Sequence, residues 1–515
     1  MRHDGEKQTG DSKPNQPVPS VDTLTPGQFV SFLLRNEPVL IKQSGLGWTL
    51  NEQKSVWDVL KKLDEEVVTV ESALTHRRSS MRLKEFLTRT VENGEVGLYA
   101  KDLHFDLLCK KYGLTAPESA NVPTIFRDDW LNWYYQVCRS EDRDDYSFLY
   151  VGGEGSLTGV HHDVVCSFSW SANCQGTKRW ILIPPDSVSA LFDCTDWSLV
   201  DDLRKGQYSE ERFPQLRDCT RLEVIQTPGT VLFVPSGWYH MVINEVTGQG
   251  SKPEHKLTIS INRNWINSFN LYQVWAFLRK ELLAVRTEIS DIRAARLVDS
   301  ETPTIIRSIK SPGIDDLDLH RGNFIGLGGV GVATMSASEW FSHCETLLRA
   351  NAALGLIDFV ELIASRSIMM HTCAARRCCP RPENSLAAEV NSLLCPRYCI
   401  NLVSKEDHDL CELLVSTTSD CLLLERADLE LERSTLFPRN QHEGDCIHRQ
   451  LTTTGNVWEF TCKELQMVIA SMKLCPEAIE HLGANARGLD LLSQLLESLV
   501  TDAGVDFHAL GSRQN

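Results

Sequence analysis

The chain has 515 residues, enough for a large hydrophobic core and for two domains, or one domain with an extension. Its 69 acidic residues outnumber 52 basic ones, and the net charge of −17 argues against a protein that holds nucleic acid by neutralising phosphates. No uninterrupted apolar run reaches the roughly 18 residues of a membrane helix. We therefore expect no direct nucleic-acid binding, no membrane insertion, and a basic protein or peptide as partner.

Residues 1–20 are polar and rich in proline, without the apolar stretch of a signal peptide, so we expect a disordered tail there. The chain contains 17 cysteines. An odd number of cysteines without a secretory signal indicates a reducing compartment with free thiols. We expect the protein in the cytoplasm, with the nucleus as a second compartment.

The first segment after this tail alternates between helical and strand patterns. Residues 25–42 predict a short amphipathic helix, a turn at 36–38 and a buried strand, and residues 51–67 predict more helix. From about 95 to 266 the pattern changes to short β runs between Pro- and Gly-rich turns, which is typical of a β-sandwich or barrel. We expect residues 21–300 to form one domain.

The pattern after the β region predicts a helix over residues 268–293. One of its faces is apolar and carries Leu271, Val274, Trp275, Leu278, Leu282 and Val285. Residues 301–335 are rich in glycine and predict a linker, and residues 336–515 predict a helical extension with helices over 336–366 and 456–500.

Within the extension, residues 371–450 are rich in cysteine and weakly periodic, so we expect a poorly ordered segment with free thiols. The spacings around Cys373, Cys378, Cys379, Cys395 and Cys399 are not the tight pairs of a structural zinc site, and zinc is the less favoured reading.

The stretch TGVHHDVVCSFSW, residues 158–170, sets two histidines and an aspartate in a β-prone run. If this run is a strand, His161 and Asp163 share a face, whereas His162 and Cys166 point the other way. A third ligand is available in His240, which lies between two β runs in GTVLFVPSGWYHMVIN. Two histidines and one carboxylate on a β scaffold suit non-haem Fe(II) with open coordination positions, so we predict these three as metal ligands and catalytic residues.

Four motifs in order resemble one known family. TGVHHD, GTKRWILIPP, FVPSGWYH and LTISINRNW look like the Jumonji C (JmjC) family of iron- and 2-oxoglutarate-dependent oxygenases, and the likeness covers about residues 99–265. The fold that this implies is α+β, with a double-stranded β-helix, or jelly roll, between N-terminal helices and the C-terminal helical extension. The implied cofactors are Fe(II), 2-oxoglutarate as co-substrate, and dioxygen.

The resemblance also implies contacts for the co-substrate. Lys178, in TKRW, matches the lysine that binds the far carboxylate of 2-oxoglutarate, and Thr158, Tyr99 and Asn262 fall where relatives place hydroxyl or amide groups. Ser171 stands where several relatives have asparagine, and Asn262 where some have threonine. Both replacements still form hydrogen bonds, so we keep them as predicted co-substrate contacts.

The run NLYQVWAFL and the N-terminal half are similar to small JmjC hydroxylases that modify a lysine of the translation termination (release) factor. The implied function is protein lysyl hydroxylation in translation termination, with succinate and CO2 as co-products. A JmjC histone lysine demethylase and a catalytically silent binding module stay open as alternatives. The apolar face of residues 271–285 packs either on its own barrel or in a homodimer.

Overall fold

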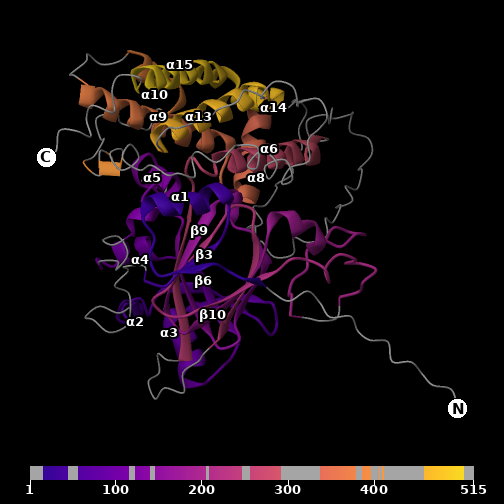
Figure 1. The fold of residues 1–515 in the computed structure, drawn as a ribbon. Helices are drawn as coiled ribbons and strands as arrows, with labels where there is room; N and C mark the ends of the chain where they lie inside the picture. Colours follow the sequence, from indigo (N-terminus) through magenta and orange to yellow (C-terminus); the bar gives the residue numbers. More distant parts are fainter. Residues whose placement is uncertain are drawn as a thin grey trace, which may run out of the picture.

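The computed structural model describes residues 16–43, 56–114, 122–139, 145–204, 208–245, 256–290, 337–378, 385–395 and 457–503, and the single positions 405, 407, 409 and 410. A β-barrel carries most of the N-terminal half, and a layer of helices lies across one end of it (Figure 1). Residues 1–15 of the predicted tail and the predicted linker 301–335 lie outside the described residues.

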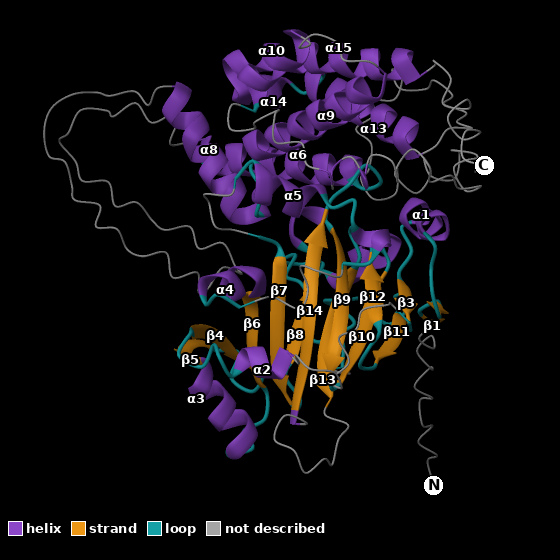
Figure 2. Ribbon diagram, turned by 90° about the vertical axis from the view of Figure 1, so that its left-hand side faces the viewer, coloured by secondary structure: helices purple, strands orange, loops and turns teal. Residues whose placement is uncertain are grey.

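Two facing sheets build the barrel (Figure 2). The smaller sheet has the order β1 (Gln16–Pro17), β11 (Leu222–Gln226), β10 (Thr177–Ile183), β13 (Tyr239–Glu245) and β8 (Leu157–His161). The larger sheet has the order β2 (Ser20–Val21), β3 (Val39–Ile41), β12 (Val231–Val234), β9 (Phe168–Gln175), β14 (Leu257–Trp265), β7 (Ser147–Gly153), β6 (Leu98–His104), β4 (Val67–Ser72) and β5 (Arg78–Arg82). This confirms the predicted α+β fold with a jelly roll.

The end of the predicted tail is ordered, which corrects the expectation for residues 16–20. Strand β1 pairs in parallel with β11, and β2 pairs in parallel with β3. Val18 between them is buried with Leu40 and Trp180. A polar, proline-containing segment is ordered here because the free edges of two sheets accept its backbone hydrogen bonds, which composition does not reveal.

Short helices and single turns connect the strands of the N-terminal half. They are α1 (Pro26–Arg35), α2 (Val56–Leu60), α3 (Leu83–Leu87), α4 (Phe105–Lys111) and α5 (Trp130–Val137), with single turns η1 (Thr88–Glu92), η2 (Thr124–Phe126), η3 (Val164–Cys166) and η4 (Pro185–Leu191). Helix α1 begins at a capping box, because the Thr25 side chain accepts from the Gln28 amide while the Gln28 side chain accepts from the Thr25 amide. The helix predicted over 51–67 is shorter than expected, since the chain turns after Leu60 and enters β4 at Val67.

The C-terminal half forms the helical layer. Its helices are α6 (Leu271–Glu288), α8 (Ala337–Ala352), α9 (Leu356–Cys378), α10 (Ser385–Leu394), α13 (Val457–Lys473), α14 (Pro476–Leu482), the turn η8 (Gly483–Asn485) and α15 (Ala486–Ala503). All six residues of the predicted apolar face of α6 are buried. The first five join one continuous hydrophobic core that runs from Trp265 in the barrel to Leu465 in α13, and Val285 packs with Trp340 and Cys344 of α8, so α6 packs between barrel and extension.

Buried polar contacts also join the two halves. The Arg366 guanidinium of α9 donates to Asp128 Oδ1 at 2.7 Å and lies over the rings of Trp130 and Trp133. The Tyr134 hydroxyl donates to Glu361 Oε2 at 2.6 Å. Because these side chains are buried, the helical layer is held in one orientation on the barrel.

The Cys-rich segment is helical where the structure describes it, since α9 reaches Cys378 and α10 begins at Ser385. Cys373 and Cys395 are buried. In the described part of the chain, no cluster of potential metal ligands includes these cysteines. None of the helices described is long and apolar enough to cross a membrane.

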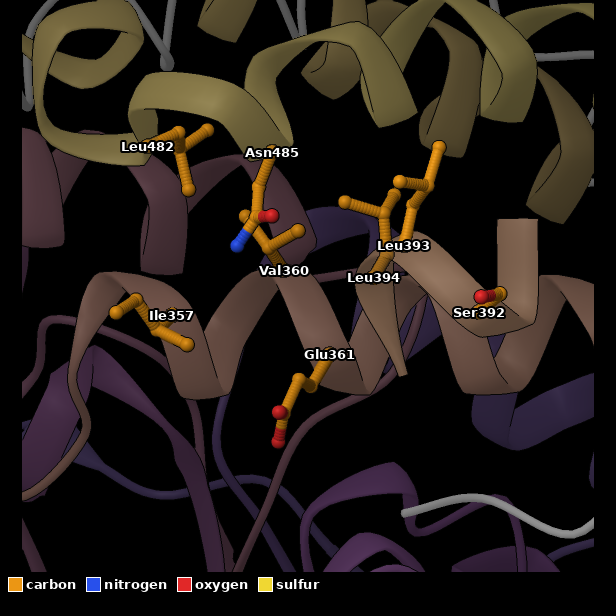
Figure 3. A pocket seen from close by; sticks show the side chains of 8 residues that line it. All are labelled: Ile357, Val360, Glu361, Ser392, Leu393, Leu394, Leu482 and Asn485. Atoms are coloured by element: carbon orange, nitrogen blue, oxygen red, sulfur yellow. The ribbon is translucent and has the colours of Figure 1, made fainter. Parts of the chain in front are cut away.

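A hollow of about 240 Å³ lies within the helical layer, among α9, α10, α14 and η8 (Figure 3). Ile357, Leu393 and Leu482 supply apolar walls, and Asn485 and Glu361 supply polar atoms. The Glu361 carboxylate already accepts the hydrogen bond from Tyr134. All residues that line this hollow belong to the helical layer, so it is separate from the histidine and aspartate cluster of the barrel.

Candidate metal centre

Two antiparallel strands bring the distant histidines together. His161 ends β8, and it is the register partner of His240 in β13. Their ring centroids are 4.2 Å apart. With Asp163 they form the one group of potential metal ligands found among the described residues, and their ligand atoms all lie within 4.8 Å of one another.

Asp163 reaches this group from a turn and not from a strand. Strand β8 ends at His161, and Asp163 is the N-cap of η3. Within that turn Val165 and Cys166 have left-handed backbone conformations, at φ 49° and 55°. The predicted proximity of His161 and Asp163 is observed, but the turn accounts for it in place of the strand alternation that we had assumed.

The neighbours of the triad lie as expected. The ring of His162 packs against Tyr239 and Phe277, with centroids 5.0 and 5.6 Å away, so it points away from the triad. Cys166 is buried, and burial raises the pKa of its thiol to about 12. The group of potential metal ligands found among the described residues does not include Cys166, which agrees with leaving it out.

Backbone carbonyls orient both imidazoles. His161 Nδ1 lies 2.9 Å from the Gly159 carbonyl oxygen, and His240 Nδ1 lies 3.2 Å from that of Trp238. Each Nδ1 therefore carries the proton and donates it, which leaves Nε2 with a free lone pair for a metal. This is the arrangement found in most metal-binding histidines.

The charge state of the triad also suits a cation. Burial, and then the neighbouring His240, lower the pKa of His161 to about 3, and burial lowers the pKa of His240. Burial alone would raise the pKa of Asp163, but His240 and His161 together with hydrogen bonds from Ser169 and Asn264 lower it overall. Two neutral imidazoles and one carboxylate match Fe(II) and leave coordination positions for other ligands.

Two serines and two asparagines line the barrel face beside Asp163. Ser169 Oγ donates to Asp163 Oδ2 at 2.7 Å, and the Asn264 side chain also hydrogen-bonds this carboxylate. Ser171 and Asn262 lie two positions away on the same strands, and therefore on the same face. Ser171 Oγ donates to Asn262 Oδ1 at 2.9 Å. The sequence pointed to Ser171 and Asn262, but it missed Ser169, whose only signal is its spacing of two from Ser171.

Lys178 is a buried cation in the barrel, with 1% of its surface exposed. Its Nζ lies 3.4 Å from the Tyr99 hydroxyl and over the rings of Tyr150 and Trp180. Among the described residues no carboxylate contributes to the pKa of Lys178, and burial lowers this pKa to about 7. A buried ammonium without an acidic partner fits an anionic ligand that brings its own carboxylate.

Tyr99 connects Lys178 to further polar groups. Its hydroxyl hydrogen-bonds the side chains of Thr158 and Asn244, and burial raises the pKa of Tyr99. Asn244 in turn donates to Ser156 Oγ at 2.9 Å. The structure thus brings together Lys178, Tyr99 and Thr158, as predicted, and adds Asn244. Its position in β13, four residues after His240 and so on the same face, is the signal that would have found it.

A jelly roll that holds two histidines and an aspartate inside one barrel defines a cupin-like metal protein, and residues 26–271 match the family described as a cupin-like domain. The chain is 33% identical over 372 residues to the human 2-oxoglutarate and iron-dependent oxygenase JMJD4, with 66% of this chain and 73% of that protein covered. The chain belongs to this family of JmjC 2-oxoglutarate and iron-dependent oxygenases. The predicted resemblance and the predicted Fe(II), 2-oxoglutarate and dioxygen are thereby confirmed.

Two further relatives cover somewhat less. The zebrafish (Danio rerio) protein of the same name is 32% identical over 286 residues, 52% of this chain and 64% of the relative. The Arabidopsis thaliana arginine-specific demethylase JMJ20 is 35% identical over 301 residues, 52% of this chain and 61% of the relative. The match thus spans less than two thirds of the length of these two relatives.

Proposed function

We propose that this protein is an Fe(II)- and 2-oxoglutarate-dependent protein hydroxylase that adds a hydroxyl group to a lysine of the translation termination (release) factor. The observation that carries the oxygenase part is the pairing of the ligand triad with Lys178, a buried cation without a carboxylate partner among the residues that the structure describes. The triad accounts for the metal, and Lys178 accounts for a dicarboxylate co-substrate. The expected place of action is the cytoplasm, where translation ends.

When bound, Fe(II) and 2-oxoglutarate supply the chemistry by which dioxygen oxidises a substrate C–H bond while the co-substrate becomes succinate and CO2. The protein's own residues hold and orient the participants. His161, Asp163 and His240 present the metal ligands, and Ser169 fixes the carboxylate of Asp163. Lys178 binds the far carboxylate of the co-substrate, and because it is buried, this ion pair forms out of water.

The choice of lysine rests on resemblance and charge. The run NLYQVWAFL resembles hydroxylases that modify the release factor, and the net charge of −17 favours a positively charged substrate segment by long-range attraction. The second candidate is demethylation, which the 35% identity to a relative named as an arginine-specific demethylase supports. Both reactions begin with oxidation of a C–H bond, but only demethylation releases formaldehyde.

Turnover of the purified full chain with the release factor separates the candidates. We expect succinate formation and a gain of about 16 Da, the mass of one oxygen atom, on a lysine, without formaldehyde. Formaldehyde from a methylated peptide would favour the demethylase. If the folded wild-type protein forms no succinate with any of these substrates, the chain is a silent binding module. His240→Ala is the control for background oxidation.

A further inference from the structure

The connection between β10 and β11, residues 184–221, presents a tryptophan to solvent. The Trp197 side chain is 75% exposed, which is unusual for so large an apolar group. Its φ of 60° lies in the left-handed region, which a bulky residue rarely adopts. The exposure of the indole and the positive φ both cost free energy, which points to a role for Trp197 other than stabilising the fold.

The loop around Trp197 is tightly hydrogen-bonded. Phe192 and Leu199 form a β-bridge at its base. The Trp197 amide donates to the Asp193 carbonyl at 3.0 Å, and the Asp193 carboxylate accepts from the Thr195 amide at 2.8 Å. Because the loop closes on itself in this way, the indole is held in solvent by a preorganised structure.

A ladder of aromatic rings leads from Trp197 to the metal ligands. Trp197 contacts Phe192, Phe192 contacts Tyr239, and Tyr239 contacts His162, with centroid distances of 6.5, 6.0 and 5.0 Å. Tyr239 precedes the ligand His240, and His162 lies between the ligands His161 and Asp163. The ladder therefore links the exposed indole to side chains that neighbour the metal ligands in sequence and point away from the triad.

The charge of the connection matches a basic partner. Residues 184–221 carry eight acidic and five basic side chains, a net charge of −3. The face of a tryptophan ring attracts ammonium and guanidinium groups more strongly than the other aromatic rings do. Beside the indole, Asp193 and Asp196 pair with Arg212, so the negative charge that suits a lysine- or arginine-rich segment is that of the connection as a whole.

We propose that Trp197 and the ring ladder Phe192, Tyr239 and His162 dock the protein segment next to the target lysine, with a basic side chain of that segment on the indole face. This inference rests on the proposed function, because it assigns the substrate of that same site to a surface. Exposed aromatic residues often provide much of the affinity of an interface, so Trp197 is expected to determine affinity and not chemistry.

Trp197→Ala tests the surface, with Trp197→Phe as the conservative variant and Leu474→Ala as the matched control. Leu474 is also strongly exposed, at 66%, but it belongs to the helical layer. With the release factor as the probe, Trp197→Ala should raise KM about tenfold and leave kcat and the KM for 2-oxoglutarate unchanged. Trp197→Phe should recover part of the loss, and Leu474→Ala should match the wild type.

Binding of the release factor to metal-free protein, measured by calorimetry, gives a readout that needs no turnover. A weaker Kd for Trp197→Ala supports the docking surface, even if the bound factor gains no oxygen and the hydroxylase proposal fails. A Trp197→Ala variant that binds and turns over like the wild type overturns the docking surface and leaves the hydroxylase intact. If wild-type protein neither binds nor modifies the factor, both proposals are overturned.

Discussion

Replacing Lys178 by methionine removes a charge from the barrel interior and keeps a side chain of similar length. Burial lowers the pKa of Lys178 from 10.5 to about 7. At about 1.4 kcal/mol per pH unit, this difference means that the buried ammonium destabilises the folded protein by up to about 5 kcal/mol below pH 7. We expect Lys178→Met to raise the free energy of unfolding of the ligand-free protein by several kcal/mol at about pH 6.

The pH dependence identifies the cause. Between about pH 7 and about pH 10.5 the unfolded chain binds a proton at Lys178 that the folded chain does not, so wild-type stability rises with pH across this window. Methionine does not titrate, so the advantage of the variant should shrink across the same window. Urea denaturation at about pH 6 and about pH 9 measures this difference, with Lys84→Met as control because Lys84 is exposed.

Binding of the co-substrate should change in the opposite direction. Without the ammonium, the far carboxylate of 2-oxoglutarate loses a charge-assisted hydrogen bond in a buried site, and we expect its affinity to fall on the order of 100-fold. Calorimetry with Mn(II) in place of Fe(II) measures this affinity. A Lys178→Met protein that is no more stable than the wild type at about pH 6, or that binds 2-oxoglutarate equally well, would refute the role of Lys178.

Three further predictions concern the metal and the helical layer. His240→Ala should abolish tight Mn(II) binding in calorimetry without unfolding the protein, and unchanged affinity would exclude His240 as a ligand. Ser169→Ala should weaken Mn(II) about 10-fold to 100-fold, because the Asp163 carboxylate loses its 2.7 Å hydrogen bond, whereas an effect below twofold would contradict this. Asp128→Asn should lower the free energy of unfolding by about 3 to 5 kcal/mol, since it leaves the Arg366 guanidinium buried without its carboxylate, and a variant as stable as the wild type in urea would contradict the pairing.

The predictability of each element depended on how local its signal is. The apolar stripe of α6 and the blocks that became α8, α9, α13 and α15 follow from helical periodicity, which is a local property. The central strands β10, β13 and β14 are long enough and apolar enough to recognise in the same way. Strands β4, β5 and β11 were missed because each is only five or six residues long. Strand β5, at the sheet edge, also has a single apolar residue, and only pairing with β4 makes it a strand.

In the candidate site, too, the features with a local sequence signal were predicted, and those that depend on distant contacts were not. Residue type and motif order named His161, Asp163, His240 and Lys178 and led to the family. The β8–β13 register, which pairs His161 with His240, is a contact between distant parts of the chain. The turn that aims Asp163 depends on packing around Val165, which no periodicity encodes.

By itself the sequence determined the types of the metal-ligand side chains, the family and the apolar faces of the long helices, because each depends only on residues that are close together in the chain. Only the tertiary structure decided that Lys178 has no carboxylate partner in the described part of the chain, that Trp197 stands in solvent beside the ring ladder, and that barrel and helical layer share one core. Burial and pairing depend on every segment that surrounds a side chain, and those segments meet only when the chain has folded.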